Sequence, residues 1–384
     1  MSTTPTLTTA DSAVLTPLET PCYLLDPAAV AEDLRDLRAA LGTGVVVSVK
    51  ASPVLDLLVR CNAEFVDGIE IASLGELNLT VGRLSVPRFV NTPAMDATLI
   101  AAALACKATL VADGPQQIAL IEEALRKPAL QARGPQGIVL RINAASLLER
   151  TGPHADHFGM DLATLHRELD RFSSREGAPR VVGLHVFAGS HSFSNTAVEL
   201  AERLNHLVEK VLGYPAAALE FVMIGTGLPA NWRDADIDFA PYRAALEGLQ
   251  TRVKVLHEAG RAVFSRSGRF VTRVVAVKPL NQESVVVCDG GMAQCFALAQ
   301  TEQFVKRWRE PVLVPAEARD APNPARAYTV VGNSCNRADV IGRLTSATEP
   351  RPGDWLVFDH SGAYHSYSPT GFLNLRPARR YLAS

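Results

Sequence analysis

Short apolar runs rich in β-branched residues alternate, over the first two thirds of the chain, with segments whose apolar residues recur every three or four positions. The short runs predict eight strands, at residues 45–50, 65–73, 88–91, 108–113, 137–143, 181–188, 219–225 and 262–266. The segments between them predict amphipathic helices, one of which covers residues 242–259. This alternation favours an α/β fold of the (β/α)8 TIM-barrel type, with a doubly wound sheet as the alternative.

The pattern changes near residue 270, where the helical spacing largely stops. Strand-like runs separated by Pro, Gly and Asn turns follow, at residues 270–280, 283–291, 311–316, 327–333 and 355–360. They predict a C-terminal β domain, a sandwich or a barrel, which also takes the strand-like N-terminal segment. The expected organisation is therefore a flexible tail, an N-terminal strand segment, a barrel and the β domain, over residues 1–16, 17–28, 29–269 and 270–384.

Composition narrows the possible partners. The chain has 384 residues, 47% of them hydrophobic, and a net charge of −2, so it has no field that would attract nucleic acid or an anionic membrane. The six cysteines form no CxxC pair, which argues against a zinc site or a disulfide framework. The first residues resemble no signal peptide, and no apolar stretch reaches membrane-spanning length, so a cytoplasmic protein is expected.

Lys50 is the first candidate for chemistry, because it ends the first predicted barrel strand. Reactive groups of such barrels lie at the carboxyl ends of the strands, where an amine can serve as a nucleophile. On its position alone, Lys50 is also compatible with a lysine that only reaches solvent. Glycines follow two later strands, in IGTGLP (224–229) and in SRSGRF (265–270), and their backbone N–H groups suit a phosphate.

These features occur in the order of a known family. From Thr20 to about Pro377 the chain resembles the fold-type III pyridoxal-phosphate decarboxylases, which include the diaminopimelate, ornithine and arginine decarboxylases. SVKASP (48–53) is similar to the family's YAVKANP, GIEIASLGEL (68–77) to G-x-D-x-A-S-x-G-E-L, GLHVFAGS (183–190) to GLHCHIGS, and IGTGLP to its GGG loop. Likewise TPCYLLD, RIN followed by HFGMD, RSGR (266–269), CDGGM, GNSCNRADV (332–340) and SGAY (361–364) match family segments, with RSGR in the place of EPGR.

The resemblance implies a pyridoxal 5'-phosphate enzyme with Lys50 as the Schiff-base lysine. It implies that His185 and Phe187 contact the cofactor and that Arg141 contacts the substrate. The residues that it implies for the phosphate are Ser190, Gly225, Thr226, Gly227, Gly268, Arg269 and Tyr364. It further implies a homodimer with shared active sites, in which Cys335 enters from the partner as a proton donor beside Tyr364.

Two departures from the family affect the expected cofactor contacts. Arg266 stands where RSGR replaces EPGR, in the place of the glutamate that keeps the pyridine nitrogen protonated. Arginine cannot accept that hydrogen bond, so the ring would be a poorer electron sink unless another acid such as Glu70 substitutes. This motivates a fold-type III amino-acid racemase or epimerase as one alternative. Phe187 replaces a stacking histidine but keeps an aromatic face.

Departures after the cysteine affect the expected substrate. Asn336 and Arg337 replace the family's Glu-Ser after the cysteine, where an acidic group binds a distal ammonium, so a basic amino acid would lose an attraction and meet a cation. The favoured reading is therefore decarboxylation of an amino acid or conjugate with an acidic or amide-linked distal group, such as the siderophore intermediate citryl-diaminopropionate, or of a carrier-bound aminoacyl unit. A decarboxylase of meso-diaminopimelate or another free amino acid, and a non-catalytic carrier of the cofactor, are the further alternatives.

Overall fold

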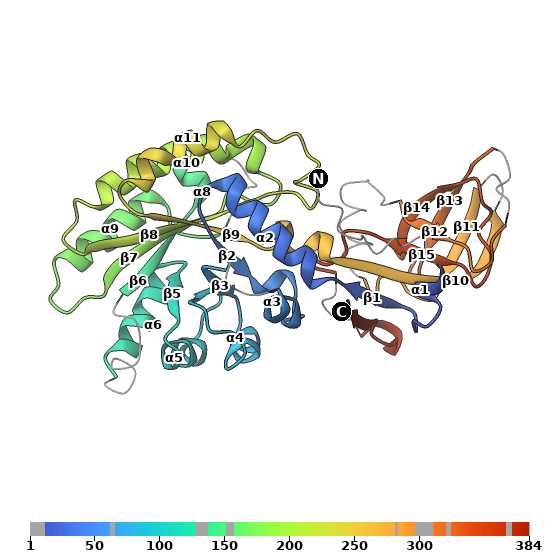
Figure 1. The fold of residues 1–384 in the computed structure, drawn as a ribbon. Coiled ribbons are helices and arrows are strands. Elements are labelled where there is room, and N and C mark those ends of the chain that lie inside the picture. Colours follow the sequence, from blue (N-terminus) through green and yellow to red (C-terminus); the bar gives the residue numbers. More distant parts are fainter. Residues whose placement is uncertain are drawn as a thin grey trace. The chain divides into compact units, whose positions relative to one another are not determined.

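The computed structural model describes residues 12–61, 66–127, 137–150, 157–280, 283–295, 310–319, 324–365 and 371–383. Contacts divide the chain into two compact units (Figure 1). One unit is Ala31–Val263, and the other joins the chain up to Val30 with the chain from Phe264 onward. The predicted barrel limits, 29 and 269, therefore differ by a few residues from the limits of the compact unit. None of the described helices is long and apolar enough to span a membrane.

The larger unit is a closed barrel of parallel strands, which confirms the (β/α)8 fold over the doubly wound alternative. Its strands are β2 (Gly44–Ser48), β3 (Gly68–Ile71), β4 (Arg88–Asn91), β5 (Thr109–Ala112), β6 (Gly137–Ile142), β7 (Arg180–Val186), β8 (Ala217–Gly225) and β9 (Lys254–Ala259). Pairing of β9 with β2 closes the barrel. The ends of the first and last strands therefore lie side by side.

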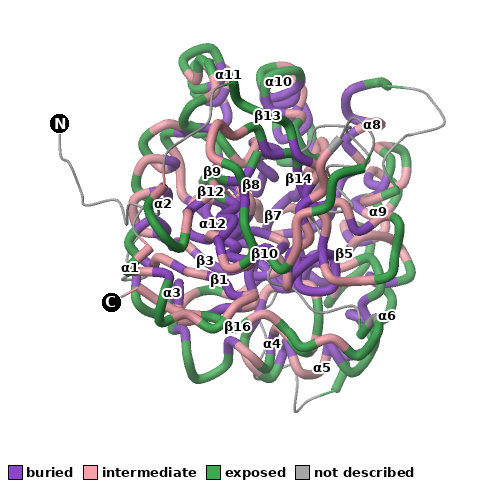
Figure 2. The backbone as a smooth tube through the Cα atoms, turned by 90° about the vertical axis from the view of Figure 1, so that its right-hand side faces the viewer, coloured by how far each residue is buried: buried purple, intermediate pink, exposed green. Residues whose placement is uncertain are grey.

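Helices follow the strands and cover the outside of the barrel. They are α2 (Pro27–Leu41), α3 (Asp56–Arg60), α4 (Leu74–Thr80), α5 (Ala97–Ala105), α6 (Pro115–Leu125), α8 (Ala144–Leu147), α9 (Leu162–Ser173), α10 (Phe193–Val211), α11 (Ala240–Gln250) and α12 (Arg261–Phe264). Ser73 caps α4 by accepting from the Glu76 amide, and the Glu76 side chain accepts in return from the N–H of Ala72, the residue before the cap. Figure 2 shows the barrel strands mainly as buried and the outward sides of α10 and α11 as exposed.

The eighth strand is not where the sequence pattern placed it. Residues 262–266 were expected to form it, but they belong to α12 and to a short 3-10 helix, η3 (Ser265–Ser267). The strand is β9, which the pattern had assigned to the end of a helix over 242–259. Lys254–Ala259 becomes a strand because it pairs with β8 on one side and with β2 on the other.

The barrel interior is built in two layers of different polarity. An apolar layer contains Val46, Phe89, Val111, Val139, Met223 and Leu256. Because side chains two residues apart on a strand point the same way, the next inward positions are Ser48, Asn91, Asp113, Arg141, Gly225 and Glu258. Five of these six residues are polar, and all lie toward the carboxyl ends of the strands. The fold thus places a polar floor beneath the barrel mouth, supported from below by an apolar core.

The smaller unit is a curled eight-stranded sheet that includes the N-terminal strand, as expected. Its strands are β1 (Cys22–Leu25), β10 (Gly268–Leu280), β11 (Glu283–Cys288), β12 (Val312–Val314), β13 (Arg326–Val331), β14 (Val340–Ser346), β15 (Trp355–Phe358) and β16 (Arg379–Leu382). The long β10 pairs first with β1 and β15 and then with β11, so it connects the two halves of the sheet.

The N-terminal segment is more ordered than a tail over residues 1–16 would be. Ser12–Leu15 form a short helix, α1, and Leu15 is fully buried. Leu15 packs in one cluster with Cys22, Val271 and Trp355, so the chain is anchored to the sheet from α1 onward. Residues 1–11 lie outside the described part of the chain.

Candidate active site

Lys50 lies between two carboxylates at the mouth of the barrel. It belongs to η1 (Val49–Ala51), a 3-10 turn that directly follows β2. Its Nζ lies 3.1 Å from both carboxylate oxygens of Glu70 and 3.0 Å from Glu258 Oε1. The Lys50 side chain keeps 41% of its surface exposed, whereas Glu70 is buried. An amine held in this way is fixed in position and still accessible to a ligand.

Glu258 binds two partners at once. Its Oε1 accepts from Lys50, and its Oε2 accepts from His185 Nε2 over 3.0 Å. Burial alone would raise the pKa of Glu258, but the charge of Lys50 and the hydrogen bond from His185 outweigh it and hold the pKa below its usual range. Burial also lowers the pKa of His185. Glu258 is therefore a fixed negative charge at neutral pH, beside a neutral imidazole.

Glu70 is a carboxylate of a different kind. Ser48 Oγ donates to its Oε2 over 2.5 Å, and the residue is fully buried. Burial, together with the nearby Glu258 carboxylate, raises the pKa of Glu70 to about 7. The pKa values of the two acids beside Lys50 are therefore shifted in opposite directions. Such pairs of acids are found at sites of proton transfer.

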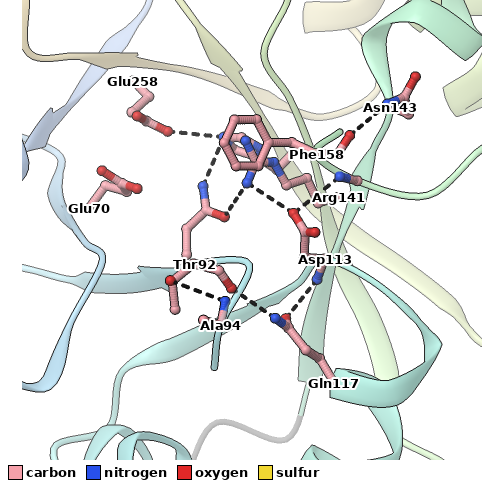
Figure 3. Close-up of polar contacts among 12 residues, drawn as sticks. Glu70, Thr92, Ala94, Asp113, Gln117, Arg141, Asn143, Phe158 and Glu258 are labelled. Carbon is pink, nitrogen blue, oxygen red and sulfur yellow. Dashed lines mark hydrogen bonds and ion pairs between the residues drawn. The ribbon is translucent and has the colours of Figure 1, made fainter. Parts of the chain in front are cut away.

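Arg141 is held rigidly on the other side of the floor. Its Nη1 donates to Asp113 Oδ1 over 3.0 Å and to Asn91 Oδ1 over 3.3 Å. The guanidinium carbon lies 4.3 Å from the centroid of the Phe158 ring. Figure 3 shows these contacts, with Gln117 bracing the turn that carries Asp113. Arg141 is therefore a buried cation whose guanidinium group is held in one orientation.

A cavity of about 180 Å³ joins these groups. It lies within the barrel unit and is lined by Lys50, Glu70, Ala72, Asn91, Pro93, Arg141, Phe158, His185, Phe187 and Glu258. Four predicted site residues, Lys50, Arg141, His185 and Phe187, therefore meet at one place. An amine, two acids, a guanidinium and two aromatic rings suit a planar, charged ligand that bonds to the amine.

Two glycine-containing loops lie next to this cavity, after β7 and after β8. A Cβ at Gly225 would come within 2.3 Å of the Phe187 ring. Gly227 has a φ of +61°, and a Cβ there would lie 2.7 Å from the carbonyl oxygen of Gly189. Only glycine permits this close approach of the loop after β8 to the segment that carries Ser190. The loops form a narrow cradle of the kind that holds a phosphate.

Comparison with known proteins decides the family. The family described as "Pyridoxal-dependent decarboxylase, C-terminal sheet domain" matches residues 22–362. The chain belongs to the pyridoxal-dependent decarboxylases. The cofactor of this family is pyridoxal phosphate, and its members are carboxy-lyases.

Relatives and solved structures of decarboxylases agree with this assignment. The chain is 27% identical over 230 residues to a diaminopimelate decarboxylase of Bacteroides thetaiotaomicron, a match that covers 58% of this chain and 57% of that relative. It is 28% identical over 383 residues to a diaminopimelate decarboxylase of Actinosynnema pretiosum, covering 90% and 80%. The fold is similar to that of a lysine/ornithine decarboxylase of Vibrio vulnificus, with a TM-score of 0.79, 22% identity and 97% coverage of both chains.

The residues around the cavity fit the cofactor of this family. The cradle between Gly225–Gly227 and the Ser190 segment suits a phosphate, and the Phe187 ring suits stacking on a pyridine. Lys50 offers the amine, and Glu258 offers a fixed carboxylate in the same cavity. The cavity thus contains an amine that can react with an aldehyde, Lys50, and a carboxylate that can face a pyridine nitrogen, Glu258.

Three predicted cofactor residues lie elsewhere than expected. Arg266 is in η3 and donates to the carbonyl of Ala29, so it does not end a barrel strand. Gly268 and Arg269 open β10 of the sheet unit, where Arg269 pairs with Asp359 over 2.9 Å. Placing these residues after the eighth barrel strand was wrong, because that strand is β9.

Glu258 and Ala259 end β9, and Gly260 and Arg261 follow it; none of the four was predicted as a site residue. They spell E-A-G-R, which shares three letters with the EPGR of the family, whereas R-S-G-R shares two. Glu258 therefore has the place of the acid in that motif. The charge of Arg261 also acts on His191, in the segment that follows Ser190. The letters E-A-G-R in the sequence could have indicated Glu258. They were overlooked because the eighth strand was placed at residues 262–266.

Thr226 is buried in the barrel unit, directly after β8, whereas four further predicted residues, Cys335, Asn336, Arg337 and Tyr364, lie in the sheet unit. Cys335 is exposed, and so are Asn336 and Arg337 in the same loop. Buried Asp339 holds this loop, because its Oδ2 accepts from the amide and hydroxyl of Ser334 and its Oδ1 accepts from Met292 N. Tyr364 follows β15 and has a φ of +62°.

Proposed function

We propose that this protein uses pyridoxal phosphate bound at Lys50 to remove the α-carboxyl group of an amino acid or an amino-acid conjugate. The observation that carries the proposal is the placement of the Lys50 amine between Glu70 and Glu258 in a cavity that also contains an aromatic face. Membership of the decarboxylase family over residues 22–362 supports the same reaction.

The cofactor, when bound, supplies the electron sink that makes loss of CO2 possible. The chain's own residues would hold the cofactor and provide the charges around it. Lys50 would hold the cofactor through its amine, and Glu258 would provide the negative charge that favours a protonated pyridine nitrogen. Phe187 would offer its face to the ring, while the glycines after β8, together with Ser190 and Arg261, would hold the phosphate. Arg141 orients the substrate from the opposite wall of the cavity.

The choice between decarboxylase and racemase depended on Arg266. A racemase was motivated by an arginine at the end of the eighth strand, where it would face the pyridine nitrogen. Glu258 has that strand position and Arg266 lies in the sheet unit. The motive for a racemase therefore disappears, and the decarboxylase remains.

We further propose that the enzyme is a homodimer with shared sites. Cys335 and Tyr364 belong to the sheet unit and would complete the site of the partner, with Cys335 as the proton donor. The exposure of Cys335 supports this role, since a donor from another chain must lie on the surface.

Mixing inactive Lys50→Ala chains with inactive Cys335→Ala chains should restore activity through heterodimers that contain one intact site. Failure to restore it in verified heterodimers would contradict the shared site.

The substrate that we favour has an acidic or amide-linked distal group. Asn336 uses its side-chain oxygen to accept from Ala338 N, and Arg337 beside it is exposed and cationic. A distal carboxylate or amide suits this loop better than a distal ammonium. A siderophore-type conjugate such as citryl-diaminopropionate, or a carrier-bound aminoacyl unit, has such a group. Free meso-diaminopimelate is the alternative, and the names of the relatives favour it.

A CO2-release assay with purified holoenzyme tests the proposal. The panel contains meso-diaminopimelate, lysine, ornithine and citryl-diaminopropionate. Release from a conjugate with an acidic tail, with little from the basic amino acids, would support the favoured substrate. Rapid release from meso-diaminopimelate would support the alternative. No CO2 from any amino acid or conjugate by an enzyme that carries its cofactor would contradict the proposed reaction.

A further inference from the structure

Ser48 and Glu70 both depart from the family wording, and the two side chains contact each other. In SVKASP, Ser48 stands where the family's YAVKANP has alanine, and in GIEIASLGEL, Glu70 stands where the family has aspartate. The two residues are register partners on β2 and β3. Their side chains therefore point to the same face, and Ser48 Oγ donates to Glu70 Oε2 over 2.5 Å. Because the two substituted side chains contact each other, we expect Ser48 and Glu70 to act together.

We propose that Glu70 stores and returns the proton of the Lys50 amine, and that Ser48 is the positioning residue that orients Glu70 for this task. The inference rests on the proposed function, because it assumes that Lys50 binds and releases the cofactor. It goes further by assigning a separate proton-carrying acid to the lysine. Glu258, the other acid within reach of Lys50, keeps its charge throughout.

The contacts of Glu70 show why it can carry this proton. Both of its oxygens lie 3.1 Å from Lys50 Nζ, and Ser48 engages Oε2, which leaves Oε1 to Lys50. The other ionisable groups that line the cavity with it are Glu258 from β9, His185 from β7 and Arg141 from β6. Burial and the like charge of Glu258 make the neutral acid accessible near neutral pH.

Glu258 is unsuited to the same task. His185 occupies its Oε2, and Lys50 occupies its Oε1. These contacts favour the charged form and keep the carboxylate a weak base. A proton leaving Lys50 therefore goes to Glu70, which is the stronger base of the two acids.

The transfer balances as a single proton step. When Lys50 is set free as an ammonium, one Nζ–H bond breaks and its electron pair stays on nitrogen. An O–H bond forms at Glu70 Oε1, so a charge pair becomes two neutral groups. The reverse step returns the proton. The hydroxyl of Ser48 favours the carboxylate form, because it donates a hydrogen bond to the charged group.

The test uses holoenzyme and four variants. Ser48→Ala removes the donor, Ser48→Thr keeps a hydroxyl, and Glu70→Gln removes the titrating group. Thr43→Val is the matched control, since Thr43 precedes the same strand but its hydroxyl contacts His257, which does not line the cavity. Two quantities are measured against pH: the absorbance of the lysine-bound cofactor without substrate, and kcat/KM.

Proton storage by Glu70 predicts matching shifts in both measurements. Loss of the donor from Ser48 raises the pKa of Glu70, so Ser48→Ala should move the absorbance inflection and the acid limb of kcat/KM to higher pH by about one unit. Ser48→Thr and Thr43→Val should match the wild type, and Glu70→Gln should lose the inflection.

Titration curves of Ser48→Ala and Glu70→Gln that coincide with the wild-type curve, in enzymes that bind cofactor and turn over, would overturn this inference alone. A wild-type protein without lysine-bound cofactor would instead overturn the proposed function on which it rests.

Discussion

His185 Nε2 donates a hydrogen bond of 3.0 Å to Glu258 Oε2, and so links the end of β7 to the end of β9 across β8. The other oxygen of the same carboxylate accepts from Lys50, which follows β2. One carboxylate thus connects three strand ends around the mouth of the closed barrel. This relationship identifies Glu258 as an acid beside Lys50, the lysine that we propose to bind the cofactor.

Replacement of Glu258 tests that identification. Glu258→Gln keeps the shape but removes the charge, and Lys50 and His185 lose a buried anionic partner. The loss should be about 2–4 kcal/mol, which corresponds to roughly a 30- to 1000-fold decrease in kcat. Arg266→Ala is the control, because it replaces the residue first expected at this place, and kcat should change less than about threefold by the same argument. The opposite ranking of the two variants in steady-state assays would return the role to Arg266.

The glycine cradle makes a separate prediction. Gly227→Ala places a methyl group against the Gly189 carbonyl at a φ of +61°, so the loop must shift and cofactor affinity should fall about tenfold. Gly177 has a similar φ of +73°, but a Cβ there meets nothing within 4 Å. Gly177→Ala therefore carries the backbone strain without the clash, and its affinity should be unchanged. Equal affinities of the two variants in cofactor titrations would argue against the cradle.

Buried His257 predicts a pH dependence of stability. Its ring nitrogens contact the hydroxyls of Thr43 and Tyr242, each over 2.6 Å, and burial lowers its pKa to about 3. Below about pH 6.5 the unfolded chain binds a proton here that the native chain does not, so stability falls with falling pH. Between about pH 6.5 and pH 5 this histidine should remove about 2 kcal/mol from the free energy of unfolding. Denaturant curves of His257→Gln should show a pH slope that is smaller by this amount, and an unchanged slope would contradict the assignment.

The loop after the cysteine makes the prediction about substrate. Asn336→Glu combined with Arg337→Ser restores an anion and removes a cation, so a distal ammonium gains an attraction and loses a repulsion. Each contact of this kind is worth on the order of 2–4 kcal/mol, so preference should shift toward basic amino acids by roughly 30-fold or more. The ratio of kcat/KM for lysine to that for the best acidic-tailed substrate measures the shift. A ratio equal to that of the wild type would show that this loop does not contribute to recognition of the substrate's distal group.

Local patterns were sufficient for much of the fold and part of the site. Lys50 and Gly225–Gly227 could be placed because each ends an apolar run at the strand end where barrels carry their chemistry. The strand β9 could not, because Tyr242, Leu246, Leu249, Val253 and Leu256 continue the spacing of α11 without a break. Only pairing with β8 and β2 overrides that helical period.

Contacts between strands account for what the sequence could not show. The hydrogen bond between Ser48 and Glu70 depends on the register of β2 against β3. The network of Arg141, Asn91 and Asp113 joins three strands whose residues are far apart in the chain. A single sequence contains these residue types but not their pairing, so the charges of the site had to come from the structure.

Lys50 is the residue on which the whole account depends. Borohydride reduction of purified holoenzyme, followed by peptide mass analysis, shows directly which residue carries the cofactor. We expect the cofactor mass on the peptide that contains Lys50, and Lys50→Ala should lose both the trapped cofactor and its absorbance while keeping its fold by circular dichroism. Cofactor trapped on another lysine, or a Lys50→Ala protein that retains the absorbance and full turnover, would contradict the assignment.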